Sequence, residues 1–209
     1  RYFDRVSGGD TCVGTSAPVI FDDNTAWYHI VLEVDTTLGT AADRVKMYVN
    51  GVFKAFNYDN QPGQNQALSF GNVATRSISS NYNGSNYFDG YQAETIFIDG
   101  LALQADSFGE FDADSEIWKP INVSGLTFGS IGFYLEYQSS GALGTDSSGG
   151  SNTFTANNIE ATNQTTDTCT LNGCTMNSLS NYWTNGAQFS EGNLQINTNT
   201  SGKAWNMST

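Results

Sequence analysis

The sequence predicts an all-β protein, and three observations lead to that fold class. Tyr, Phe, Thr, Ser, Asn and Gly, which favour strands and turns, are abundant, whereas Lys, Arg, Glu and Met, which favour helices, are scarce. Apolar and polar residues alternate in short runs, which is the period of a strand with one buried face. The dipeptide Asn50-Gly51 separates two such runs. With 209 residues, 38% of them hydrophobic, the chain can build one sizeable core.

The strongest local signal lies between residues 27 and 56, where two strands and a hairpin are expected. Apolar residues alternate with more polar ones from Tyr28 to Val34 and again from Val45 to Val49. The second run leads into Asn50-Gly51, and both of these residues tolerate the positive φ angles that a two-residue type I′ turn requires. A half-buried antiparallel sheet with a tight hairpin is therefore predicted.

Further elements are expected along the middle of the chain. The run from Tyr91 to Ile98 alternates as a strand does, and Asp99-Gly100 predicts a second hairpin-type turn. Ala105 to Glu110 is compatible with one helical turn, which Asp106 or Ser107 would cap. Gly132 to Tyr137 is predicted to be a strand.

A resemblance to a known family makes the fold more specific. A Trp27-x-His29 strand ending at Asp35, with a later strand ending Tyr-Val-Asn-Gly at residues 48–51, resembles the laminin G-like, or concanavalin A-like, jelly roll. Residues 88–103 are similar to a later strand of that family. The layout at residues 107–110, 118–120, 132–135 and 146–149 resembles structural, tail-fibre-like proteins of marine bacteriophages. The resemblance covers about residues 20 to 195 and implies an antiparallel β-sandwich.

Two units are expected on this basis. Residues 1–137 would be the laminin G-like jelly-roll core, with its first strands missing, because the chain opens on a strand-like run and we expect it to be part of a longer polypeptide. From Gln138 onward Ser, Thr, Asn and Gly predominate, and large apolar side chains are too few for a second independent core. Residues 138–209 are therefore expected to be an extended segment that leads to a further module.

Composition and charge argue against several functions. The net charge of −13 and the isoelectric point near 4.1 argue against nucleic-acid binding, which relies on Lys and Arg. No apolar run is long enough to span a membrane, so membrane insertion is not expected. One histidine and the three cysteines, Cys12, Cys169 and Cys174, do not make a zinc site. Cys169 and Cys174 fit either a disulfide or a pair of thiols.

The candidate binding residues lie in a loop. Residues 79–87 are rich in Asn, Ser and Tyr, which is typical of adaptable binding surfaces, and we take Tyr82, Asn83 and Tyr87 as glycan-binding candidates. The alternative is that this segment is only a turn-rich hairpin end. Further aromatic faces are offered by Tyr91 and Trp118, and by Trp27, although Trp27 is expected to lie in the core.

The acidic stretch from Glu110 to Glu116 is compared with the paired carboxylates of glycoside hydrolases. Such enzymes on this fold present alternating carboxylates from a strand. Here the last Glu is one place too far along and the stretch follows a helix-like turn, so a solvated loop is expected. No nucleophile motif accompanies His29, and no catalytic residue is assigned. Asp112-Ala-Asp114 alone is a weak calcium signal, so no metal site is assigned, although the resemblance makes calcium a conceivable cofactor.

The sequence and the resemblance together predict a non-enzymatic virion structural module of a phage-like fibre or capsid-surface protein, which contributes to host-surface adhesion. The expected partners are other copies of the chain, neighbouring virion proteins and cell-surface glycans, and the expected location is the virion surface. A carbohydrate-binding lectin domain is the alternative, and a glycoside hydrolase is a less favoured one.

Overall fold

The computed structural model describes residues 2–6, 9–16, 26–68, 76–80, 85, 87–165, 187–190 and 195–198. The strands are β1 (Tyr2–Val6), β2 (Gly9–Ser16), β3 (Ile30–Val34), β4 (Val45–Val49), β5 (Val52–Lys54), β6 (Phe56–Asn60), β7 (Thr95–Phe97), β8 (Gly109–Phe111), β9 (Trp118–Pro120), β10 (Phe133–Leu135), β11 (Ala187–Ser190) and β12 (Gln195–Thr198). Between them lie the short 3₁₀ turns η1 (Ala41–Asp43), η3 (Ala105–Ser107) and η4 (Ala161–Asn163).

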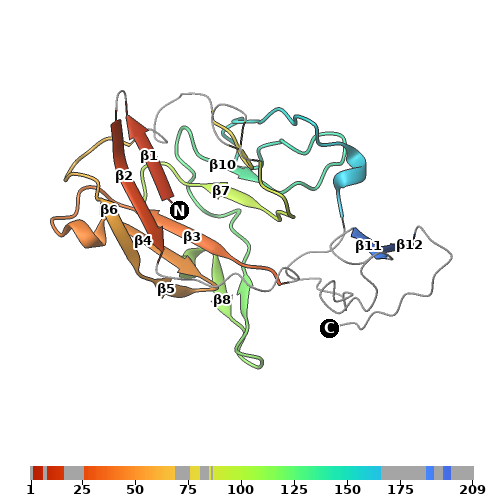
Figure 1. Cartoon of the computed structure of the whole chain (residues 1–209), viewed down its shortest axis with the longest axis horizontal. Helices are drawn as coiled ribbons and strands as arrows, with labels where there is room; N and C mark the ends of the chain where they lie inside the picture. The colour runs from red at the N-terminus through yellow and green to blue at the C-terminus, as the bar shows by residue number, and fades with distance from the viewer. Residues whose placement is uncertain are drawn as a thin grey trace.

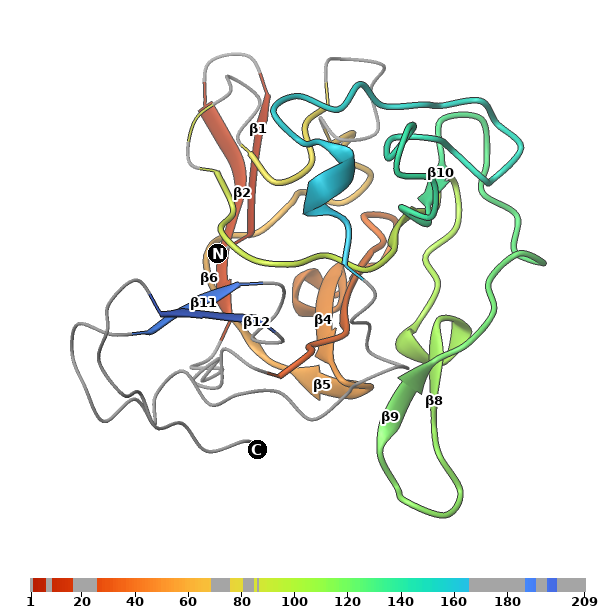
Figure 2. The ribbon, with the colours of Figure 1, turned by 90° about the vertical axis from the view of Figure 1, so that its right-hand side faces the viewer.

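The strands form small antiparallel sheets, which confirms the all-β prediction. Their orders are β1-β2-β6, β3-β4-β5, β10-β7, β8-β9 and β11-β12. The β8–β9 hairpin projects from the lower side of the body in both ribbon views (Figure 1 and Figure 2). In the described part of the chain, helical structure is limited to three-residue turns, and none of it could cross a membrane.

The hairpin predicted at Asn50-Gly51 joins β4 to β5. Asn50 has φ 48° and Gly51 has φ 75°, and Val49 pairs with Val52 directly across the turn. Both angles are positive, as a two-residue type I′ turn requires. Asn50 also ties the turn to the segment before β3, because its Oδ1 accepts a 2.8 Å hydrogen bond from the His29 N–H and its own N–H donates to the His29 carbonyl.

The more buried face of β3 carries Val31 and a carboxylate. Glu33 is only 8% exposed, whereas Ile30 on the other face is 56% exposed. The register places Glu33 opposite Lys46 and Val31 opposite Tyr48. Glu33 accepts a hydrogen bond of 3.0 Å from the Tyr48 hydroxyl and pairs with the Lys46 ammonium at 3.4 Å. Its charge is therefore buried with partners, which a buried ion requires.

A second buried charge fixes the loops beside β4. Arg44 is 8% exposed, and its guanidinium donates hydrogen bonds of 2.7–2.9 Å to the backbone carbonyls of Leu38, Gly39 and Pro62. Five N–H donors in one plane allow a single arginine to satisfy carbonyls from two separate loops. Residues 38–39 and 62 are held together at the start of β4 in this way.

The core joins elements that are distant in sequence. Phe128 and Tyr134 stack with their ring centroids 6.0 Å apart, and Val31 of β3 belongs to the same cluster. The buried members of this cluster are Val31, Ala105, Phe108, Val123, Phe128 and Tyr134. Tyr48 and Trp118 are half-buried side chains packed against it. Burial of this apolar surface is the main favourable contribution to the free energy of folding.

For residues 99–110 the helical turn is confirmed in shorter form, whereas the hairpin turn and the cap are wrong. Asp99-Gly100 does not form a hairpin, because β7 pairs with the distant β10, and the Asp99 N–H donates instead to the Phe128 carbonyl. The helical turn is confined to η3, and its N-cap is Gln104, with no side-chain capping bond from Asp106 or Ser107. Gly109 already begins β8. The strands predicted at residues 91–98 and 132–137 are confirmed in shorter form, as β7 and β10.

The segment after β10 is anchored by Asp146. Its Oδ1 accepts 2.9 Å bonds from the Tyr134 and Ser148 N–H groups, and its Oδ2 accepts from the Ser148 hydroxyl and the Asn152 N–H. Burial alone would raise the pKa of Asp146, but these hydrogen bonds outweigh it, so the pKa is lowered. Residues 146–152 are thereby bound to β10. Cys169 and Cys174 lie outside the described residues.

Gly51→Ala tests the turn. The φ of Gly51 is positive, and a Cβ at this position would overlap the Trp118 indole. We expect a loss of about 2–4 kcal/mol in the free energy of unfolding, measured by urea denaturation. Gly125→Ala is the matched control, because its Cβ would meet no atom within 4 Å. Equal stability of the two variants would contradict this account.

Asp146→Asn tests the anchor of residues 146–152. Because the folded pKa lies below the unfolded value, Asp146 stabilises the protein above about pH 4 and loses this effect as the pH falls through its folded pKa. We expect the variant to lose about 1–3 kcal/mol at neutral pH and to be less sensitive to acid than the wild type. Unfolding free energies at pH 7 and pH 3 measure both effects. Parallel pH profiles for the two proteins would disprove the assignment.

Candidate functional site

A groove of about 450 Å³ lies between the β4–β5 turn and the β8–β9 hairpin. We call it the Trp118 groove. Its volume is within the range of small-molecule binding sites. The aromatic side chains that line it are Tyr48, Phe111 and Trp118. Gln104, Asp106 and Glu110 also line it and bring polar groups, and Gly51, Ala105 and Gly109 complete the wall.

Trp118 is placed by both hairpins. It pairs with Phe111 across β8 and β9, and the two rings meet edge to face with centroids 5.0 Å apart. A Cβ added to Gly51 or to Gly109 would overlap the indole, so the ring lies directly against both glycine backbones. The two glycines therefore allow a close approach that any other residue would prevent.

A hydrogen bond to His29 orients the indole. The Trp118 Nε1–H donates to His29 Nδ1 at 3.0 Å, and the ring centroids are 5.9 Å apart. Because Nδ1 accepts this bond, the proton of the neutral imidazole lies on Nε2. Burial lowers the pKa of His29, which favours the neutral form that this bond needs. His29 is thus a positioning residue for Trp118.

The charged groups that line the groove are carboxylates. Glu110 is 3.4 Å from the Lys119 ammonium, which is also 3.0 Å from Asp112. Asp106 is exposed and makes no ion pair with any residue that the structure describes. Burial, the hydrogen bond to Glu33, and the charges of Glu33 and then Asp106 raise the pKa of Tyr48 to about 12. The Tyr48 phenol therefore stays protonated.

From Asp112 onward the acidic stretch forms the loop of the β8–β9 hairpin, as predicted, whereas Glu110 lies in β8. Asp112 Oδ1 accepts hydrogen bonds from the Ser115 N–H, the Ser115 hydroxyl and the Asp114 N–H, and its Oδ2 accepts from Lys119. The bond from the Ser115 N–H and then the one from Lys119 hold the pKa of Asp112 well below its usual range. Such a carboxylate is a poor proton donor near neutral pH. Residues 113–117 of the loop are exposed to solvent.

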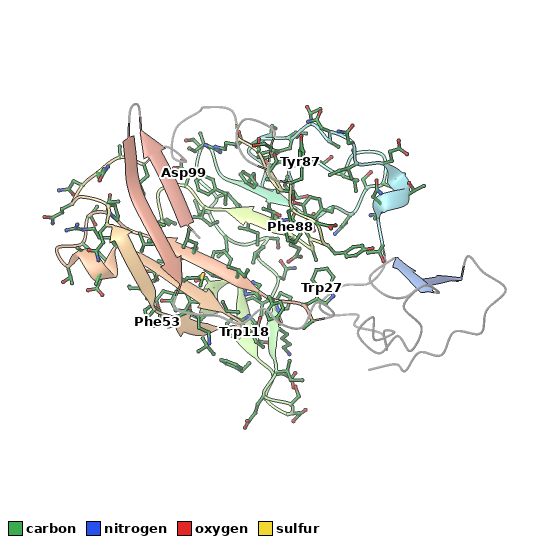
Figure 3. All side chains as sticks on the ribbon, viewed as in Figure 1. Trp27, Phe53, Tyr87, Phe88, Asp99 and Trp118 are labelled. Carbon is green, nitrogen blue, oxygen red and sulfur yellow. The ribbon has the colours of Figure 1, made fainter. Side chains whose placement is uncertain are left out.

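Tyr87, the one glycan-binding candidate among the described residues, lies away from the groove (Figure 3). Tyr87 is 73% exposed, and Figure 3 shows it at the top of the molecule with Trp118 near the bottom. Tyr82 and Asn83 lie outside the described residues. Sequence reasoning identified Trp118 as an aromatic face but not Tyr48 or Phe111. The signal that could have found Phe111 is its position opposite Trp118 across the hairpin loop of residues 112–117.

Potential metal ligands are scattered in the described part of the chain. Among the described residues, no three His, Cys, Asp or Glu side chains lie close enough together to hold a metal ion. The Asp112 carboxylate, which carried the weak calcium signal, is instead engaged by Ser115, Asp114 and Lys119.

The His29–Trp118 bond predicts a pH dependence of stability. The folded pKa of His29 lies below its unfolded value of 6.5, so the unfolded chain binds more protons as the pH falls below that value. We expect the free energy of unfolding to decrease between pH 7 and pH 5 in the wild type. The decrease should be smaller in His29→Asn, which keeps an acceptor but does not titrate. Because the chain has a single histidine, an identical decrease in both proteins would refute the assignment.

No protein-family model, no curated protein and no solved structure matches this chain.

Proposed function

We propose that the chain is a non-enzymatic structural module of a phage-like fibre or capsid-surface protein, and that it contributes to host-surface adhesion by binding carbohydrate in the Trp118 groove. The observation that carries the adhesion part of this proposal is the groove itself, where three aromatic side chains and three polar ones meet. The module would reside at the virion surface.

The chemistry of the groove suits a sugar ring. A pyranose presents C–H groups on its faces, which pack on aromatic rings, and hydroxyls at its edge, which need polar partners. Phe111 is 54% exposed and the half-buried Trp118 stands beside it, so an aromatic surface is accessible. Gln104 can donate and accept hydrogen bonds, and the Asp106 carboxylate can accept two from one sugar.

The jelly-roll sandwich is part of the same proposal. In such a sandwich, the β3-β4-β5 and β7-β10 sheets would belong to opposing layers. The core cluster supports this, because it includes Val31 of β3 and Tyr134 of β10. The exposed Ile30, Leu32 and Val52 support contacts with neighbouring copies or other virion proteins. Apolar side chains grouped on one sheet face are typical of interaction surfaces.

A lectin domain proper, with its site at Tyr82, Asn83 and Tyr87, is the second candidate. The 73% exposure of Tyr87 favours it. No calcium site is assigned to either candidate among the described residues, and calcium is included in the glycan array because the resemblance makes it a conceivable cofactor. A glycoside hydrolase is less well supported, because Asp112, Asp114 and Glu116 of the acidic stretch do not line the groove.

A glycan array with wild-type protein, Phe111→Ala and Tyr87→Ala, with and without calcium, tests the proposal. An aromatic contact worth about 1 kcal/mol corresponds to roughly fivefold in affinity. We expect Phe111→Ala to weaken binding by about that factor and Tyr87→Ala to have little effect. The reverse pattern would move the site to residues 79–87. No binding by a folded wild-type protein would remove adhesion from the proposal.

A further inference from the structure

We infer that the carbohydrate bound in the Trp118 groove carries a free ammonium group, as an N-deacetylated amino sugar does. The inference rests on the proposed function, since it names the class of sugar for the same groove. It is carried by the juxtaposition of aromatic rings with carboxylates that line one small groove.

The residues that line the groove carry negative charge. Two carboxylates line it, those of Asp106 and Glu110, and none of the described residues that line it is cationic. Lys119 neutralises part of the Glu110 charge across the hairpin, at 3.4 Å. Asp106 is exposed, and no described residue forms an ion pair with it. An anionic ligand would be repelled here, and a neutral sugar would leave the charge of Asp106 uncompensated.

Aromatic rings in the wall of the groove also favour a cation. Organic cations bind over the faces of Trp, Tyr and Phe because the ring quadrupole attracts positive charge. The Trp118 groove offers one ring of each kind, in Trp118, Tyr48 and Phe111. Asp106 and Tyr48 both line this groove. A carboxylate and an aromatic ring can therefore contact the same ammonium group.

The geometry also explains why a sugar amine fits better than a metal cation. In the described residues, no three carboxylate, thiolate or imidazole ligands converge at this groove or elsewhere. A bare divalent ion needs such a set of ligands. An ammonium on a sugar ring needs one carboxylate and one aromatic face, and the ring then supplies apolar contact with the rest of the wall.

The experiment compares glucosamine with N-acetylglucosamine and glucose, which lack the charge. Binding is followed by the indole N–H resonance of Trp118, assigned with Trp118→Phe, at a slightly acidic pH where the amine is protonated. The proteins are wild type, Asp106→Asn and the matched control Asp114→Asn. Asp114→Asn removes the same charge from the loop of the β8–β9 hairpin, outside the residues that line the groove.

We expect glucosamine to bind at least about fivefold more tightly than the neutral sugars, and added salt to weaken it. Asp106→Asn should remove this preference and Asp114→Asn should keep it. Equal binding of all three sugars, unaffected by Asp106→Asn, would overturn the inference and leave the proposed function intact. If no sugar shifts the Trp118 resonance of the folded protein, the proposed carbohydrate site and this inference both fail.

Discussion

The hydrogen bond from Trp118 to His29 is the contact on which the geometry of the groove depends. It links the β8–β9 hairpin to the residue that precedes β3, across 89 positions of sequence. Gly51 and Gly109 let the indole lie against the backbone of both hairpins. Asn50 in turn holds the His29 backbone. The β4–β5 turn, the His29 imidazole and the Trp118 indole therefore hold one another in place, and the groove lies beside them.

In the described part of the chain, buried charges have partners within the protein, whereas most acidic residues lie at the surface. The buried charges described above are compensated locally, Glu33 by Tyr48 and Lys46, and Arg44 by three backbone carbonyls. Acidic residues are instead gathered at the surface in loops such as that of β8–β9. Compensation inside avoids the desolvation cost of an unpaired ion. The carboxylate of Asp106, which lines the groove and has no ion-pair partner among the described residues, is then available for recognition of a ligand.

What the sequence predicted well was local. Two residues that tolerate positive φ are enough to specify the turn at Asn50-Gly51, and alternation is enough to place β4. The pairing of β7 with β10 was missed because partners so distant in sequence leave no local pattern, as the pair Phe97 and Phe133 illustrates. The groove was missed for the same reason, since its walls come from β4, η3 and the β8–β9 hairpin, which are separate segments of the chain.

Because the β8–β9 hairpin projects from the body (Figure 1 and Figure 2), a ligand in the groove would affect how this hairpin responds to a pulling force. A ligand in the groove would touch Tyr48 on one hairpin and Phe111 on the other, so it would act as a removable cross-link between them. A ligand that binds only this arrangement stabilises it by mass action. If the chain serves in adhesion as proposed, part of the pulling force would then pass through the sugar, and binding would stiffen the contact between the two hairpins.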